Sequence, residues 1–243
     1  MCYTAPVPDQ FTIYRQHADQ YERLVSCEDY EQRLWPALSA IRSFEQADVV
    51  EWGAGTGRIT ALIAPSARFI MACDLNDHML QVARRKLTHY ERLVWQTAVA
   101  DHRHMPLPDR CADVSIAGWT LGYFNAQTFG DGWRDAICRT IAQMQRVLWP
   151  GGTIIIIETL GTGFTEPQPP TAALAAYYRV LEEELGFQAT WIRTDYVFDS
   201  LDQAVSLISF FFGSEWADKV RGNNWIVLPE CTGIWWKEVT YRK

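Results

Sequence analysis

Short apolar runs and stretches of helical periodicity follow one another along most of this chain. The apolar runs predict buried strands at 48–52, 68–73, 93–99, 112–118 and 153–157. Helical patterns occupy 9–25, 28–44, a short segment after residue 57, 77–87 and 131–148, the last with Asp131 as its expected cap. The run at 153–157 is a threonine followed by four isoleucines, which is typical of a strand covered on both faces. Strands that alternate with helices predict a parallel sheet with right-handed crossovers.

The pattern changes after residue 160. A proline-rich linker at 167–170 precedes a predicted helix at 171–185, a strand at 190–198 and a helix that begins with a capping box of Ser200 and Gln203. A last strand is expected at 232–239. We therefore predict a single domain over 1–243, with a helical lid (1–44), a ligand-binding core (45–160), a cap (161–224) and a C-terminal strand (225–243).

Composition narrows the classes of function. The chain has 243 residues, a net charge of −7 and scattered basic residues, so we expect a small-molecule substrate and no nucleic-acid partner. Its six cysteines form no CxxC pair, which argues against a zinc ribbon and favours a reducing compartment. We find no signal-peptide pattern and no apolar run long enough to cross a membrane, and we expect a cytoplasmic protein.

A glycine cluster, GAGTG at 53–57, lies directly between a predicted strand and a predicted helix. Glycines there permit a tight turn and let a ligand lie against bare backbone. A dinucleotide fingerprint needs a further glycine at position 58, where Arg58 stands, so a nicotinamide-dependent oxidoreductase is the weaker alternative. A purely structural turn is the other alternative.

Two carboxylates follow the next strands. Asp74 ends the second strand and Asp101 ends the third, at the sheet edge where ligands of doubly wound folds bind. A carboxylate at the position of Asp74 can accept both hydroxyls of a ribose, although it could also cap the helix that follows. The glycine loop and two acidic strand ends in sequence make a stronger signal than any one of them.

Four segments together resemble the class I S-adenosylmethionine-dependent methyltransferases, and more closely the small-molecule branch called type 11. They read VVEWGAGTGR (49–58), CDLNDHML (73–80), ADHRHMPLPD (100–109) and VLWPGG (147–152). The resemblance spans residues 14–157. It implies a doubly wound, Rossmann-like α/β sheet of seven strands with the last strand antiparallel. It also implies S-adenosyl-L-methionine as the cofactor and S-adenosyl-L-homocysteine as its product.

The resemblance also implies roles for individual residues. The glycine loop would flank the methionine portion of the cofactor, Asp74 would hold the ribose, and Asp101 would take the adenine amino group. Glu51 replaces the more usual aspartate near the cofactor's amino end. The full set of implied cofactor residues is Tyr14, Tyr21, Glu51, Gly53, Ala54, Gly55, Gly57, Asp74, Leu75, Met79, Asp101, His102, Gly118 and Trp119.

The candidate catalytic residues are Glu158 and Tyr123. Methyl transfer is an in-line displacement, to which a protein contributes mainly acceptor placement and exclusion of water. Glu158 follows the isoleucine run and could orient an acceptor or act as a general base. The alternative is a carboxylate satisfied by the backbone amides of 159–163. For Tyr123 and Trp119 the alternative is ordinary core packing.

The sequence favours methyl transfer to an O or N atom, or to a C atom, of a small metabolite. A non-catalytic module that keeps the cofactor is the alternative from a different class. His102 and His104 form an HxH pair without a third ligand at metal spacing, so no metal is expected. A target-base signature is absent after the fourth strand. The acceptor and the choice between monomer and homodimer are not encoded in any motif that we find.

Overall fold

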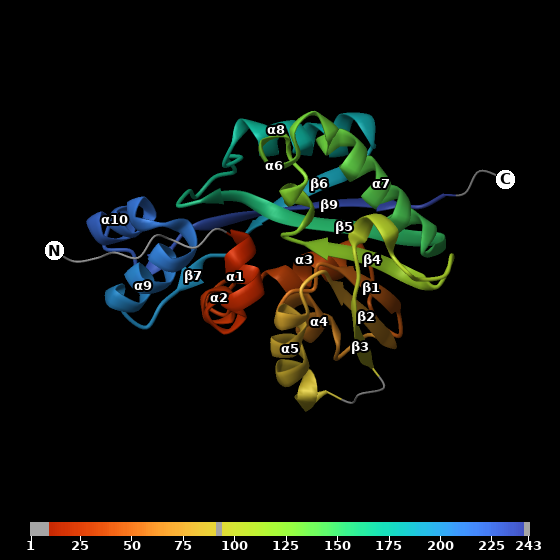
Figure 1. Ribbon diagram of the computed structural model, residues 1–243, viewed down its shortest axis with the longest axis horizontal. Helices are drawn as coiled ribbons and strands as arrows, with labels where there is room; N and C mark the ends of the chain where they lie inside the picture. Colours follow the sequence, from red (N-terminus) through yellow and green to blue (C-terminus); the bar gives the residue numbers. More distant parts are fainter. Residues whose placement is uncertain (1–9, 91–93, 241–243) are drawn as a thin grey trace.

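A computed structural model describes residues 10–90 and 94–240, so the expectations for the first nine residues lie outside the described ranges. The described chain is built on one large sheet and a small two-stranded one (Figure 1). The large sheet has the order β3 (Trp95–Val99), β2 (Phe69–Asp74), β1 (Asp48–Trp52), β4 (Ala112–Gly118), β5 (Leu148–Thr162), β9 (Glu230–Glu238) and β6 (Gln188–Arg193). Strands β1 to β5 are parallel, while β9 is antiparallel to both of its neighbours. The predicted seven-stranded sheet with an antiparallel last strand is confirmed.

Helices cover both faces of this sheet (Figure 1). One face carries α3 (Leu34–Ile41), α4 (Arg58–Ile63) and α5 (Asp77–Lys86), and the other carries α7 (Trp133–Arg146) and α8 (Ala172–Arg179). Alternate isoleucines of β5 serve the two layers. Ile155 and Ile157 join the core beneath α3 and α4, whereas Ile154 and Ile156 join the core beneath α7 and α8. This explains why the strand is apolar on both sides.

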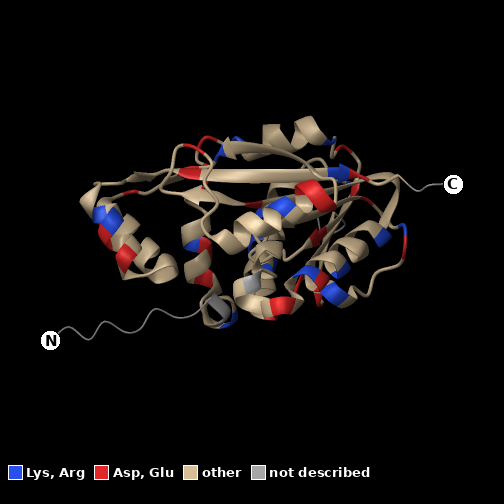
Figure 2. Cartoon of the chain, turned by 90° about the horizontal axis from the view of Figure 1, so that it is seen from above, with Lys and Arg blue, Asp and Glu red and all other residues tan. Residues whose placement is uncertain are grey.

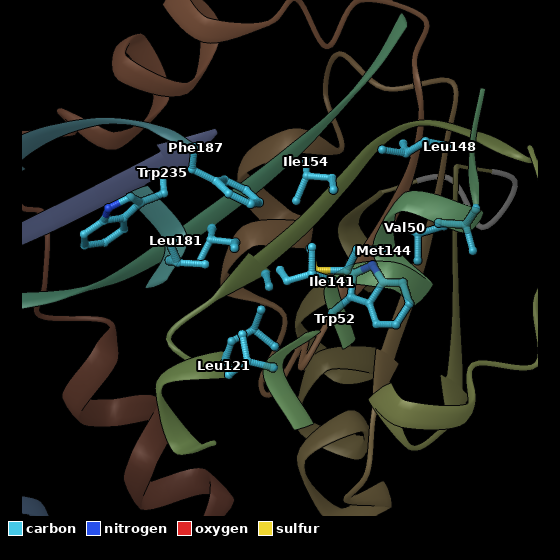
Figure 3. Packing of buried hydrophobic residues seen from close by; sticks show 14 of the residues in the cluster. Val50, Trp52, Leu121, Ile141, Met144, Leu148, Ile154, Leu181, Phe187 and Trp235 are labelled. Atoms are coloured by element: carbon cyan, nitrogen blue, oxygen red, sulfur yellow. The ribbon is translucent and has the colours of Figure 1, made fainter. Parts of the chain in front are cut away.

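The core under α7 and α8 contains large aromatic side chains (Figure 3). Trp52, at the end of β1, is fully buried beside Met144 of α7, and its ring N–H donates a 2.7 Å hydrogen bond to the Ser115 hydroxyl. A buried indole needs such a partner, because an unsatisfied N–H is costly. Burial of Trp52 therefore fixes the end of β1, and with it the start of the glycine loop.

The strand order changes direction between β1 and β4, which makes this the switch point of the sheet. Trp52 pairs in register with Cys73 of β2 and with Ala117 of β4. The loops that follow these three strands therefore start at the same level. In open α/β sheets the crevice at such a point is the usual place for a ligand.

The N-terminal lid differs from the prediction of two long helices. The first is divided at His17 into α1 (Gln10–Gln16) and α2 (Ala18–Val25). The second was expected at 28–44 but is limited to α3, since Asp29 and Gln32 have positive φ angles of 61° and 56°. The Asp29 carboxylate accepts hydrogen bonds from the backbone N–H groups of Arg33 and Leu34, at 2.8 and 3.0 Å, and so starts α3 later.

The cap is an additional unit beside the lid (Figure 1). It consists of α9 (Leu201–Phe212), α10 (Ser214–Gly222) and a small sheet of β7 (Tyr196–Val197) and β8 (Val227–Leu228). The strand expected at 190–198 is therefore divided between two sheets. The cap packs on Leu24 of α2, so the lid and the cap share one apolar cluster.

Two of the expected helix starts were right and one was wrong. The Ser200 hydroxyl accepts a 3.2 Å hydrogen bond from the Gln203 N–H, and the Gln203 side chain reaches back to the Asp199 N–H. The Thr171 hydroxyl likewise caps α8, which continues as a π turn at Val180–Glu184. Asp131 does not cap α7, because it lies in a 3₁₀ turn (Gly130–Gly132) that follows the short helix α6 (Ala126–Phe129).

Candidate active site

The glycine loop is held tightly between its neighbours. Gly53 has a φ of +70°, and a Cβ at this position would overlap the Thr120 side chain. Gly57 has a φ of +77°, and its Cβ would lie 3.0 Å from that of Ala83 on α5. Both positions therefore require glycine for conformation as well as for space. Ala54, between them, is buried, and its N–H donates to the Cys73 carbonyl oxygen at 2.9 Å.

Asp74 ties this loop to the end of β2. Its Oδ2 accepts a 2.8 Å hydrogen bond from the Gly55 N–H, and its Oδ1 accepts one of 2.8 Å from the Asn76 N–H. Burial raises the pKa of this carboxyl group, and the backbone hydrogen bonds oppose the rise. Each oxygen keeps a second lone pair, so the group fits the two hydroxyls of a ribose. One contact binds the glycine loop and the other binds Asn76, the residue directly before α5, so Asp74 connects the loop to the start of that helix.

Glu51 lies beneath the glycine loop. Its carboxyl group accepts a short hydrogen bond from the Thr60 hydroxyl on α4, and the residue is 2% exposed. Burial raises its pKa to about 8. The side chain therefore contacts α4, on the same side of the sheet as α3, and links the end of β1 to the helix that follows the glycine loop.

The residues assigned to the adenine portion lie at the ends of β2 and β3. Leu75 is 57% exposed, whereas Met79 on α5 is buried and packs with Tyr14 and Tyr21 of the lid. Asp101 accepts a 2.9 Å hydrogen bond from the Arg103 N–H and forms an ion pair of 2.6 Å with the Arg103 guanidinium. The Arg103 side chain is the main reason why the pKa of Asp101 falls to about 2.

His102 points into the molecule. Its ring lies edge-on to Trp52 at 6.0 Å and to Phe124 at 6.4 Å. Its Nε2 is buried and has no hydrogen-bond partner among the described residues. Burial lowers the pKa of His102 to about 4, so the ring is neutral at physiological pH. A neutral, buried imidazole nitrogen beside Asp101 is compatible with the adenine end of a cofactor.

The two lid tyrosines pack against each other near Met79. Tyr14 and Tyr21 meet edge-to-face with ring centroids 5.5 Å apart, and Tyr21 also contacts Phe211 of α9 at 5.6 Å. Burial is the main cause that raises the pKa of Tyr14, and both Asp74 and Glu158 add to it. The Tyr14 hydroxyl is therefore near enough to both carboxyl groups to feel their charge. The role of both tyrosines as lid contacts of the cofactor stays a prediction.

Gly118 and Trp119 form the end of β4. A Cβ on Gly118 would lie 3.2 Å from the Ile59 side chain, so the strand packs closely on α4. Trp119 has a φ of +50°, and its N–H donates a 2.6 Å hydrogen bond to the Ile157 carbonyl oxygen. Its ring lies 4.2 Å from the centre of the Arg58 guanidinium, a cation–π contact.

Glu158 is a buried carboxyl group at the carboxyl end of the apolar part of β5. Its Oε1 accepts a 2.7 Å hydrogen bond from the N–H of Gly122, in the 3₁₀ turn Leu121–Tyr123 that carries Tyr123. The expected alternative was wrong in its partner, because the amide comes from the turn after β4 and not from 159–163. Burial raises the pKa of Glu158 to about 8. A base of that pKa is well matched to neutral or mildly alkaline conditions.

Sequence reasoning missed three contributors to the site. Gly122 supplies the amide that orients Glu158, and no motif marks it. Tyr177 of α8 is fully buried, its hydroxyl has no partner among the described residues, and Glu158 acts on its pKa. Arg58 was noticed only as a missing glycine, yet it is fixed against Trp119 and Glu28.

The described residues contain no group of three or more His, Cys, Asp or Glu side chains that could hold a metal ion. Within the same ranges, no helix has the length and apolar character needed to span a membrane.

The site combines a glycine loop after β1, a carboxylate after β2 and a second carboxylate after β3, on a sheet with this strand order. These are the features that the resemblance to class I methyltransferases implies. Residues 50–156 match the type 11 family model, which is described as a methyltransferase domain. This segment, which is less than half of the chain, is therefore similar to methyltransferase domains.

Similar proteins agree with this assignment. The chain is 27% identical over 134 residues to a demethylmenaquinone methyltransferase of Tropheryma whipplei, covering 55% of this chain and 47% of that protein. It is 34% identical over 133 residues to a ubiquinone/menaquinone biosynthesis C-methyltransferase of Bordetella avium, covering 52% and 47%. The chain thus spans about half the length of these curated relatives.

A solved structure shows the same fold. A methyltransferase from Aquifex aeolicus, described as S-adenosylmethionine-dependent, superposes with a TM-score of 0.57 at 14% identity, over 91% of this chain and 98% of that one.

Proposed function

We propose that the chain methylates a small hydroxyl-bearing acceptor, at the oxygen or at an adjacent carbon, with Glu158 as the general base. The carrying observation is the position of Glu158. It is a buried carboxyl group with a pKa of about 8, oriented by the Gly122 amide, and it acts on the same Tyr14 hydroxyl as Asp74 does.

The surroundings of Glu158 support an acceptor with a flat ring. Glu158 contributes to the raised pKa of both Tyr14 and Tyr177, and Tyr123 also contributes to that of Tyr14, so these three rings lie near one another and near Glu158. Aromatic faces pack well against an aromatic acceptor. The curated relatives are named as methyltransferases of quinone biosynthesis, which supports the same chemical class of acceptor.

The proton can be followed through the site. When bound, S-adenosylmethionine supplies an activated methyl group. Ionised Glu158 accepts the proton of the acceptor hydroxyl, and the electron pair that remains on the oxygen, or is delocalised to the adjacent carbon, forms the new bond to the methyl carbon. The bond from the methyl carbon to the sulfonium sulfur breaks at the same time, and its electron pair stays on the sulfur of S-adenosylhomocysteine. In transfer to carbon, the ring proton at that carbon then returns to the oxygen. The lid tyrosines keep water away, because Tyr14 and Tyr21 pack on Met79 and on the cap.

The proposed setting is the cytoplasm, without a nucleic-acid partner. The five cysteines in the described ranges are free, as in a reducing compartment. Figure 2 shows positive and negative residues interspersed over the helices in that view. A phosphate backbone would be better matched by a continuous basic stripe.

Calorimetry and a transfer assay test the proposal together. We expect S-adenosylmethionine and S-adenosylhomocysteine to bind, with Asp74→Ala weakening binding more than Glu158→Ala does. Incubation with labelled S-adenosylmethionine and a panel of phenols, hydroquinones and amines should label a hydroxylated ring. Binding without transfer to any acceptor would favour the non-catalytic module, and loss of binding in Glu158→Ala but not in Asp74→Ala would show that the site is assigned wrongly.

A further inference from the structure

Arg58 is the first residue of α4 and directly follows the glycine loop. Its guanidinium lies over the Trp119 ring at 4.2 Å, and its Nη1 donates a 2.6 Å hydrogen bond to Glu28. The other oxygen of Glu28 accepts a 3.1 Å hydrogen bond from the Thr194 hydroxyl. The guanidinium is therefore held in one orientation by an aromatic face and a buried carboxylate.

The second terminal nitrogen of Arg58, Nη2, makes no hydrogen bond to the described residues. Nη2 is buried and has no partner among the described residues, and it is the one atom of an Arg or Lys side chain in that condition there. Arg103 and Lys86, which also lie near this sheet edge, are paired with Asp101 and Glu22. A charged donor without a partner is costly to bury, so an anionic or strongly polar ligand that accepts a hydrogen bond from Nη2 would remove this cost.

Nη2 lies in the interior, because it is buried even though Arg58 also lines an open hollow of about 630 Å³ between α4 and the segment before α3. The guanidinium lies at the switch point of the sheet. Trp119, whose ring it covers, directly follows β4, and Arg58 itself directly follows the glycine loop after β1.

The glycine loop itself has few donors left for an anion. The N–H groups of Ala54, Gly55 and Gly57 donate to Cys73, Asp74 and Ala54, respectively. A carboxylate beside this loop therefore needs a donor from a side chain. Arg58 is next to the loop in the chain and carries a free N–H.

We propose that Arg58 Nη2 binds the α-carboxylate of S-adenosylmethionine, while Glu28 and Trp119 hold the guanidinium in place for it. The inference rests on the cofactor assignment but adds a contact that the family motifs do not specify. Arginine is suited to this task, because its planar fork pairs with a carboxylate through charge-assisted hydrogen bonds.

The test compares S-adenosylmethionine with decarboxylated S-adenosylmethionine, which lacks only the carboxylate. Isothermal titration calorimetry of the wild type should show about 10- to 100-fold tighter binding of the complete cofactor. The variant Arg58→Met/Glu28→Gln removes the contact together with its partner, so that no buried charge is left unpaired and the net charge is unchanged. In this variant we expect the affinity ratio to fall close to one, mainly because the complete cofactor binds more weakly.

The controls separate the possible failures. Glu28→Gln alone keeps Arg58 and should keep most of the discrimination, while Asp74→Asn should weaken both ligands by the same factor. A double variant that unfolds cooperatively and still discriminates as the wild type does would overturn the inference. Equal weakening of both ligands in it would also overturn the inference and assign Arg58 a structural role. If neither ligand binds the wild type, the cofactor assignment itself fails.

Discussion

The backbone N–H of Gly122 donates a 2.7 Å hydrogen bond to Glu158 Oε1 and so links the turn after β4 to the end of the apolar run in β5. A Cβ at position 122 would lie 3.0 Å from Glu158 Oε2 and 3.1 Å from Leu174. Glycine therefore leaves room for the carboxyl group in this orientation. Each carboxylate oxygen has two lone pairs, so the amide leaves the group able to receive a proton from an acceptor.

The rate of methyl transfer should depend on the ionisation of Glu158. Because burial raises its pKa to about 8, we expect the rate at saturating substrates to rise with pH and to level off above pH 8. Glu158→Gln should lower the rate by about 10²- to 10⁴-fold and remove this rise. Initial rates measured across the pH range provide the comparison.

Glu230→Gln is the matched control for this experiment. Glu230 is also buried, and burial raises its pKa, but its carboxyl group accepts a hydrogen bond from the Thr159 hydroxyl and not from the Gly122 amide. Its replacement should leave the pH profile in place. A profile that moves with Glu230 and not with Glu158 would contradict the assignment of the base.

The glycine loop should tolerate no side chain at position 53. Gly53→Ala combines a positive φ with overlap of the Thr120 side chain, whereas Gly130→Ala has a φ of +56° and no atom within 4 Å of the new Cβ. We expect Gly130→Ala to lower the free energy of unfolding by about 1 kcal/mol. Gly53→Ala should cost at least about 1–3 kcal/mol more, because it adds a steric clash. Equal losses in urea unfolding would mean that the loop can move away from Thr120.

Glu51 should make the folded chain less stable as the pH rises. Burial raises its pKa from 4.5 to about 8, so between these values the folded state keeps a proton that the unfolded state has lost. The stabilising effect is complete below pH 4.5 and disappears as the pH passes through 8. Glu51→Gln has no proton to lose, so its free energy of unfolding should fall less between pH 5 and pH 9, by an amount on the order of a few kcal/mol. Parallel curves for the two proteins would show that Glu51 is ionised in the folded state.

The central sheet was predictable because its signals are local. β1 and β4 occupy the residues expected for them, since each is an apolar run closed by glycine or by a turn. The glycine loop and Asp74 were also found from spacing, and the structure joins them through the Gly55 N–H. The carboxyl ends of parallel strands lie at one edge of the sheet, so residues that directly follow successive strands lie close together in the fold.

The predicted bounds of one helix and one strand were wrong where side chains pair with residues far away in the sequence. The helix expected from residue 28 begins at Leu34, where Asp29 caps it, and Glu28 instead pairs with Arg58 and Thr194, far along the chain. The strand expected at 190–198 is interrupted where the Asp195 carboxylate binds Arg193 and the backbone of Glu230. Helical or strand periodicity cannot predict such pairings. It likewise cannot predict that the Gly122 amide binds Glu158.

The contact between Glu28 and Tyr196 has a practical consequence for anyone who wishes to change the acceptor by exchanging segments between related enzymes. The two residues form an isolated antiparallel bridge, and the backbone N–H of Asp29 donates to Thr194 next to it at 3.2 Å. The segment before α3 and the segment before the cap are thus paired directly through their backbones. A chimera that received a new cap without the matching lid would lose this pairing, so both segments should be exchanged together.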